Sequence, residues 1–282
     1  MSRHRSDVAG CAPPIPSDRA YRQAMQRRDA LRWPAQTDRC VGDATPNRNT
    51  PMTWNATVVL WAQYGASLLA GLATTLELAA IAIAGSLLLG TLVSLASLSR
   101  WRPIRAIAAA YVDFVRCVPL LVHAMFWYFG ATELLPLAVK EWIYEQDLSM
   151  IAGATALIVY SASFVAEDIR SGIRSISGGQ IEAARALGFG FLRSFRWVIF
   201  PQAIEAVIPP LIGQAMVITK NTSVTLMIGV VELINATRRV QDATFRIVEP
   251  YAFATLSYLI VCSLLTLLAM RYERWAKGGA VA

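Results

Sequence analysis

Apolar runs long enough to cross a lipid bilayer constrain this chain more than any other feature. A membrane-spanning helix needs about 20 mostly apolar residues, and only helices or closed barrels satisfy their backbone groups inside lipid. The chain has 282 residues, and 55% of them are hydrophobic, which is unusual for a soluble domain with a polar surface. The sequence therefore predicts an all-α membrane protein with five transmembrane helices, at about residues 65–98, 107–129, 149–165, 202–227 and 251–270.

The charges in the short connecting segments predict how these helices are oriented. Arg and Lys concentrate in the cytoplasmic loops of membrane proteins. The segments after the first, third and fifth helices are basic, and the segment between the second and third is mainly acidic. The chain is thus expected to be N-out and C-in. The basic residues are Arg100, Arg102, Arg105, Arg170, Arg174, Arg185, Arg193, Arg196, Arg271, Arg274 and Lys277.

Residues 1–51 differ from the rest of the chain and are treated as a separate region. They contain nine Arg and five Asp, several prolines and no apolar run, so they cannot bury enough surface to fold. Two interpretations stay open: a disordered tail, or residues that precede the true start at Met52. An Arg-rich tail before an N-out helix conflicts with the charge rule, which favours the second interpretation. Residues 52–282 are expected to form the membrane domain.

The segment at residues 170–201, between the third and fourth predicted spans, is too polar for lipid yet contains strong helix formers. Residues 180–187 read QIEAARAL, which predicts a short helix. Gly178 and Gly179 precede this helix and Gly188 follows it, and glycine commonly marks helix boundaries. Ala183 and Ala184 predict a smooth face that another protein can approach closely.

Several motifs identify a family resemblance that covers about residues 65–275. The strongest combines Glu182, Ala183, Ala184, Gly188 and Pro201, whose spacing resembles the EAA loop of ABC importer permeases, with Val198 and Phe200 in place of the usual Ile and Leu. Four other stretches resemble polar amino-acid permeases. They are residues 71–76, 114–130, 160–173 and the Lys-Asn-Thr-Ser run at 220–223.

The resemblance implies a permease domain at 52–282 that lies in the bacterial inner membrane and imports polar amino acids. The short helix becomes a coupling helix that docks on a cytoplasmic ATPase dimer, which binds ATP and Mg²⁺ in place of this chain. The other implied partners are an extracytoplasmic amino-acid-binding protein, a second permease chain, identical or similar, and membrane lipid. The second span and residues 133–136 look most like the glutamate/aspartate branch.

Ionisable and polar residues inside the spans are candidates for the substrate path, because such groups are costly in lipid and usually face a cavity or a partner. The candidates are Glu77, Lys220, Asn221, Thr222 and Ser223. Structural roles stay open as alternatives: a subunit contact for Glu77 and hydrogen bonds between helices for the others. Pro209 and Pro210 are expected to interrupt the fourth helix. Asp168 and Glu167 are expected to pair with Arg170 or Arg174.

The chain lacks the motifs of several other function classes. It has no phosphate-binding loop for ATP, no catalytic constellation and no His/Cys spacing typical of a metal site, so it is not predicted to be an enzyme. Its net charge of +7 forms no basic stripe with aromatic residues, which argues against nucleic acid. An ATPase-independent channel or anchoring subunit is the main alternative, and a membrane-embedded enzyme is a third.

Overall fold

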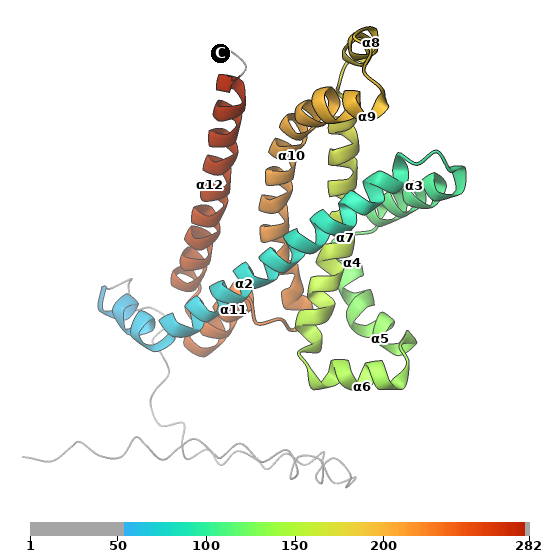
Figure 1. The fold of residues 1–282 in the computed structure, drawn as a ribbon. Coiled ribbons are helices and arrows are strands. Elements are labelled where there is room, and N and C mark those ends of the chain that lie inside the picture. The colour runs from blue at the N-terminus through green and yellow to red at the C-terminus, as the bar shows by residue number, and fades with distance from the viewer. Residues whose placement is uncertain (1–53, 280–282) are drawn as a thin grey trace, which may run out of the picture. The chain divides into compact units, whose positions relative to one another are not determined.

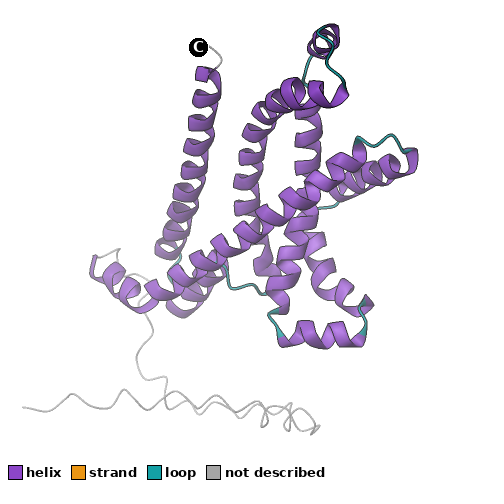
Figure 2. Cartoon of the chain, in the orientation of Figure 1, coloured by secondary structure: helices purple, strands orange, loops and turns teal. Residues whose placement is uncertain are grey.

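The computed structural model describes residues 54–279, and the predicted tail at 1–51 lies outside them. Within this range every regular element is a helix, which confirms the all-α fold (Figures 1 and 2). The long helices are α2 (Trp54–Ser97), α3 (Arg102–Cys117), α7 (Leu148–Arg174), α10 (Phe200–Asn221), α11 (Leu233–Thr244) and α12 (Val248–Gly279). The shorter elements are α4 (Leu120–Met125), η1 (Phe126–Gly130), α5 (Ala131–Leu134), α6 (Leu137–Glu145), α8 (Gly178–Ala186), α9 (Phe191–Ser194), η2 (Phe195–Ile199) and η3 (Thr222–Ile228).

Helices α2 and α7 form the centre of the molecule, and Figure 1 shows α2 crossing α7 diagonally. A Cβ atom added at Gly90 of α2 would lie 2.6 Å from Val165 Cγ1 and 2.9 Å from the Ala162 carbonyl oxygen of α7. Small residues at such crossings let two membrane helices approach closely. Leu78 on α2 and Leu157 on α7 are fully buried beside this crossing. The core is therefore built on close contact between the first and third spans.

The predicted second span is not a single straight helix, which corrects the expectation for residues 107–129. It consists of α3 and the segment that begins with α4, and the two are bent by 103°. Pro119 causes the break, because proline lacks an N–H and disfavours a helical conformation in the residue before it. Val118 accordingly has φ −99° and ψ 128°, in the extended region. Within residues 54–279, four helices are long and apolar enough to cross a membrane, or up to five if this bent pair is one span.

The predicted fourth span also differs from expectation, because Pro209 and Pro210 do not interrupt it. Helix α10 continues through both prolines and passes directly into η3, which ends where Gly229 adopts φ 91°. The two prolines have no N–H to donate, so the carbonyls of Glu205 and Ala206, four residues earlier, lose their usual helical partners. The helix therefore continues to Asn221 without the two backbone hydrogen bonds that residues 209 and 210 would otherwise donate.

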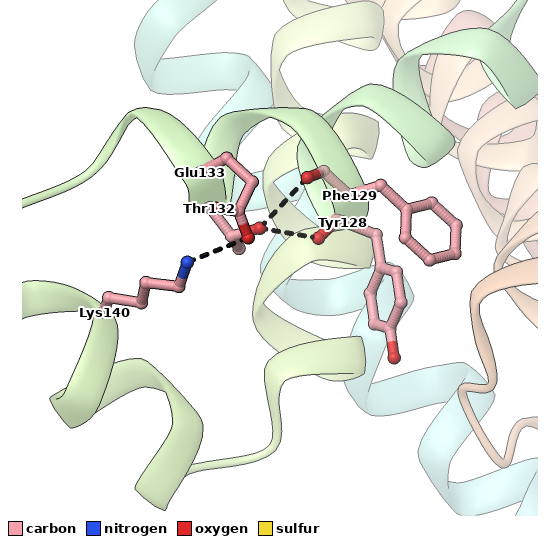
Figure 3. Close-up of polar contacts among 5 residues, drawn as sticks. All are labelled: Tyr128, Phe129, Thr132, Glu133 and Lys140. Atoms are coloured by element: carbon pink, nitrogen blue, oxygen red, sulfur yellow. Dashed lines mark hydrogen bonds and ion pairs between the residues drawn. The ribbon is translucent and has the colours of Figure 1, made fainter. Parts of the chain in front are cut away.

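The polar segment after α4 is stabilised by local contacts around α5 and α6 (Figure 3). The Thr132 hydroxyl donates to the carbonyl oxygens of Tyr128, at 3.0 Å, and Phe129, at 3.3 Å. Lys140 Nζ on α6 pairs with Glu133 Oε1 on α5 at 2.8 Å. This ion pair joins the two short helices across the turn between them.

Candidate functional site

Helix α8 coincides with the helix expected from the QIEAARAL sequence, although its start differs. Gly178 and Gly179 lie inside the helix, after Ser177 at the N-cap, so they are not its boundary.

Gly188 marks the C-terminal end of α8, as expected, with φ 79°. Its N–H donates to the Arg185 carbonyl at 2.9 Å, and the Phe189 N–H donates to the Ala184 carbonyl at 3.0 Å. This pair of bonds is a Schellman cap, which requires a left-handed residue and so favours glycine at position 188.

The two alanines of the motif have different surroundings, which corrects the expectation of a smooth alanine face. Ala183 is exposed, as is Glu182. Ala184 is only 3% exposed and faces into the chain. Helix α8 packs against α9 and η2, so Ala184 allows that close packing. Of the two alanines, Ala183 alone is open to an incoming partner.

The segment after α8 ends in a π-helical turn, η2, which passes into α10 at Phe200, one residue before Pro201. The Phe200 N–H reaches back to the Phe195 carbonyl, one residue further than in an α-helix. Pro201 cannot donate a backbone hydrogen bond, and Gln202 instead donates its side-chain amide to the Val198 carbonyl at 2.8 Å. Pro201 thus stands at the junction where the loop becomes helix α10.

An exposed surface of apolar and basic side chains surrounds α8. Leu187, Leu192 and Trp197 are exposed, and the Arg196 guanidinium lies 5.7 Å from the Trp197 ring centroid. In Figure 1 helix α8 stands at one end of the molecule, beyond the ends of α7 and α10. Exposed aromatic and arginine side chains are typical of protein interfaces. This arrangement can receive a protein partner.

A cleft of about 720 Å³ lies beside this surface. The residues that line it are Ser175, Ile176, Ser177, Gln180, Gln202, Glu205, Ala206, Pro209, Tyr272 and Glu273. It therefore lies where the ends of α7 and α12 meet the starts of α8 and α10. Glu205 and Ala206, whose carbonyls are freed by the two prolines, both line it. The cleft places polar groups close to helix α8.

The substrate-path candidates on α10 and η3 do not form one cluster. Lys220 is exposed, and Asn221 and Ser223 are partly exposed, whereas Thr222 is fully buried. The Thr222 hydroxyl donates to the Thr219 carbonyl at 2.8 Å, and the Ser223 hydroxyl donates to the Lys220 carbonyl at 2.7 Å. Both hydroxyls therefore already have a backbone partner within the helix. Lys220 and Asn221 keep their side chains available.

Glu77 is exposed on α2 and, within residues 54–279, has no hydrogen bond or ion pair. Its neighbour Leu78 faces the core instead. Because an isolated carboxylate is costly in lipid, this exposed position suits a subunit contact as well as a substrate path.

A buried polar network around Glu232 is the main feature that the sequence analysis missed. Glu232 is 0% exposed and caps α11, accepting from the N–H groups of Ile234 at 2.9 Å and Asn235 at 2.8 Å. Tyr258 on α12 donates to Glu232 Oε2 at 3.3 Å, and Thr75 Oγ1 on α2 accepts from the Leu233 N–H at 3.0 Å. Burial raises the pKa of Glu232, and the backbone donors oppose that shift. The network joins the first and fifth spans through α11.

Gly71 explains how α11 comes so close to the first span. A Cβ atom at Gly71 would lie 2.7 Å from the Ala236 Cβ and 3.2 Å from the Glu232 carbonyl oxygen. Thr75 follows Gly71 by one helical turn, so both lie on the face of α2 that meets α11. The Gly71-x3-Thr75 spacing, which puts a glycine and a hydroxyl on one face of α2, is the sequence signal for this contact with α11.

A second polar group lies among α3, α7 and α10. Asp168 lies within reach of the Gln214 side chain and near the Arg116 guanidinium, and its Oδ2 atom is buried without a hydrogen-bond partner. Arg116 itself stacks over the Phe164 ring, 5.0 Å from the centroid. Glu167 pairs with Arg170 at 3.5 Å, which confirms the expected pairing for that residue. The expectation that Asp168 also pairs with Arg170 or Arg174 is wrong, because Asp168 faces α10.

Comparisons with known proteins agree with this geometry. Residues 82–277 match the family described as the binding-protein-dependent transport system inner membrane component. The chain belongs to this family.

It is a multi-pass inner-membrane protein, and its relatives carry amino-acid transport names. It is 37% identical over 187 residues to a probable glutamine ABC transporter permease protein of Bacillus subtilis (strain 168), covering 66% of this chain and 82% of that protein. It is 39% identical over 176 residues to a glutamate transport system permease protein of Corynebacterium efficiens, covering 61% and 77%.

A solved structure also matches this permease. The structure is entitled "Crystal structure of an amino acid ABC transporter with histidines", and it aligns with a TM-score of 0.70 at 30% identity. The match covers 80% of this chain and 99% of the solved chain. The fold of the described helices is therefore that of an ABC transporter membrane subunit.

Proposed function

We propose that this chain is the membrane-spanning permease subunit of an ATP-driven importer of polar amino acids. The observation that carries the proposal is helix α8, an exposed, glycine-capped helix between α7 and α10 that presents Glu182 and Ala183 outward. The energy comes from ATP hydrolysis, with ATP and Mg²⁺ held by a separate ATPase dimer. Glutamate/aspartate is the proposed substrate class, supported by the glutamate transport name of one relative.

The proposed assembly contains a second permease chain and an extracytoplasmic binding protein. With up to five candidate spans in the described part of the chain, one chain is small to enclose a pathway by itself. In the proposed N-out, C-in orientation α8 faces the cytoplasm, where the ATPase dimer can reach it. ATP binding would then displace α8, and η2 and the continuous helix α10 would carry that displacement toward Lys220.

The proposed substrate path includes Lys220 and Asn221, together with Asp168 on α7. Lys220 and Asn221 stand at the end of α10 that lies away from α8, and both keep available side chains. The buried, unpartnered Oδ2 of Asp168 is an acceptor suited to a substrate ammonium group. Glu77 is kept as a candidate on α2.

Lys220→Gln is expected to reduce uptake of an acidic amino acid at least tenfold, because it removes a charge that can meet the substrate carboxylate. The measurement is uptake of radiolabelled glutamate into proteoliposomes that contain the complete importer. Thr222→Val is the control: its buried hydroxyl has a partner within the helix, so it should cost about 1 kcal/mol of stability and leave uptake near normal. A Lys220→Gln importer with normal uptake would remove Lys220 from the path.

The experiment that tests the proposal as a whole is purification of the tagged chain in mild detergent, followed by identification of its partners. Copurification of an ATPase subunit, with ATPase activity that rises when a binding protein and its amino acid are added, is the expected result. A chain that purifies alone and conducts ions in a planar bilayer would instead support the ATPase-independent channel.

A further inference from the structure

We propose that the first half of α3, with the turn before it, binds the headgroup of an anionic phospholipid. The surface consists of Arg100, Arg102 and Arg105 with the exposed side chains of Trp101 and Ile107. In Figure 1 this segment lies apart from helix α8, and lipid binding there does not depend on which solute the permease carries.

The bend before α4 sets α3 apart from an ordinary membrane crossing. Because α3 and the following segment are bent by 103°, α3 does not continue the line of the crossing below it. Figure 1 shows the α2–α3 turn projecting from the side of the molecule. An amphipathic helix in such a position can lie along the membrane surface.

The turn that precedes α3 is held by local hydrogen bonds. The Trp101 N–H donates to the Ser99 hydroxyl at 3.2 Å, and the Arg105 N–H donates to the Trp101 carbonyl at 3.1 Å. Pro103 occupies the first turn of the helix, where its fixed φ favours helix initiation. The backbone that carries Arg100 and Arg102 is therefore fixed in this turn.

Helix α3 has three distinct faces. Ala108, Val112 and Val115 are buried and pack toward α2 and α7. Ile107 and Phe114, seven residues apart, share a second face and are 71% and 67% exposed. Arg102 and Arg105, three residues apart, share a third face and are also exposed. An apolar face and a basic face on either side of a buried stripe match the acyl chains and the headgroup of a lipid.

The charge of this surface decides the kind of lipid. From Ser97 to Tyr111 the sequence has three arginines and no acidic residue. Among the described residues none of these arginines forms an ion pair or a side-chain hydrogen bond. Trp101 is 72% exposed, and its indole is suited to the boundary between headgroups and acyl chains. The fitting occupant is a phosphodiester headgroup with net negative charge.

The test compares two matched pairs of substitutions in the full-length chain. Native mass spectrometry would measure how much phosphatidylglycerol and phosphatidylcholine the protein retains from micelles that contain equal amounts of both. R102Q/R105Q is expected to lower the retained ratio of phosphatidylglycerol to phosphatidylcholine by about tenfold or more, since each arginine contributes to anionic-lipid attraction. R271Q/R274Q removes two exposed arginines near the end of α12, away from this surface, and should lower the ratio much less.

Further arms keep the outcome interpretable. R102K/R105K keeps both charges and should retain phosphatidylglycerol, and millimolar inorganic phosphate should not displace the lipid. If R102Q/R105Q does not fold, the single variants Arg102→Gln and Arg105→Gln replace it, each with about a threefold loss expected. An unchanged ratio in these variants, an equal loss in R271Q/R274Q, or full displacement by phosphate would each overturn the proposal.

Discussion

Gly188→Asp is expected to leave the permease folded in the membrane while abolishing the stimulation of the ATPase by the binding protein. Gly188 has φ 79°, so any side chain there is strained, by about 1 kcal/mol or somewhat more. The new carboxylate would also lie at the C-terminal end of α8, where the helix dipole disfavours negative charge. A Cβ atom at this position meets nothing within 4 Å in this chain, so the effect should fall on docking. The measurement is ATPase activity of the reconstituted importer.

Gly179→Asp is the matched control for this substitution. Gly179 lies in the same helix, a Cβ there also meets open space, and its φ is not positive. A carboxylate in the first turn of a helix is favourable, so this variant should keep most of the stimulated activity. Equal loss in both variants would show that any negative charge on this surface blocks docking. Full activity in Gly188→Asp would contradict a coupling role for this cap.

Glu232→Ala is expected to lower the melting temperature of the detergent-solubilised permease markedly. The substitution removes the N-cap of α11, leaves the Ile234 and Asn235 N–H groups without their acceptor, and opens a void where the side chain was fully buried. Losing a cap costs about 1 kcal/mol, and unsatisfied buried groups cost about 1–3 kcal/mol more. Thermal unfolding followed by size-exclusion chromatography would measure the loss.

Glu133→Ala is the control, since Glu133 also forms a polar contact but is exposed. Its ion pair with Lys140 spans 2.8 Å, and exposed pairs of this kind contribute about 0–1 kcal/mol. The melting temperature should therefore change little. Similar melting temperatures for Glu232→Ala and the unsubstituted chain would mean that the contacts of α11 with α2 and α12 do not depend on this carboxylate.

Helix α8 and the Glu232 network lie at opposite ends of one continuous run of helices. Helix α8 joins α10 through η2, and η3, which follows α10, leads toward α11. At the α8 end, a Cβ atom on Gly172 of α7 would clash with Val207 of α10, so these helices are tightly packed there. At the other end, the Glu232 network ties α11 to α2 and α12. We therefore expect a motion of α8 to pass through closely packed helices.

Composition and long apolar runs were enough to identify the helical class, because lipid demands long apolar segments whatever the tertiary packing. The position of Gly188 as a helix terminator also followed from the sequence, since few residues other than glycine adopt a left-handed conformation readily. The two other glycines near this helix were not boundaries. Gly178 and Gly179 lie inside α8, where a Cβ atom would meet open space and φ is not positive, so neither position requires glycine.

Tertiary structure decided the features that depend on which faces meet. The sequence by itself determined that Pro119 and Pro209 lack a donor, but only packing decided that the first breaks its helix and the second does not. The sequence also shows that residue 232 is a carboxylate. The burial of Glu232 depends on the tertiary fold, because Gly71 and Tyr258, 187 positions apart in the sequence, meet around α11. Backbone chemistry is local and can be read along the chain, whereas desolvation and partner choice belong to contacts between distant segments.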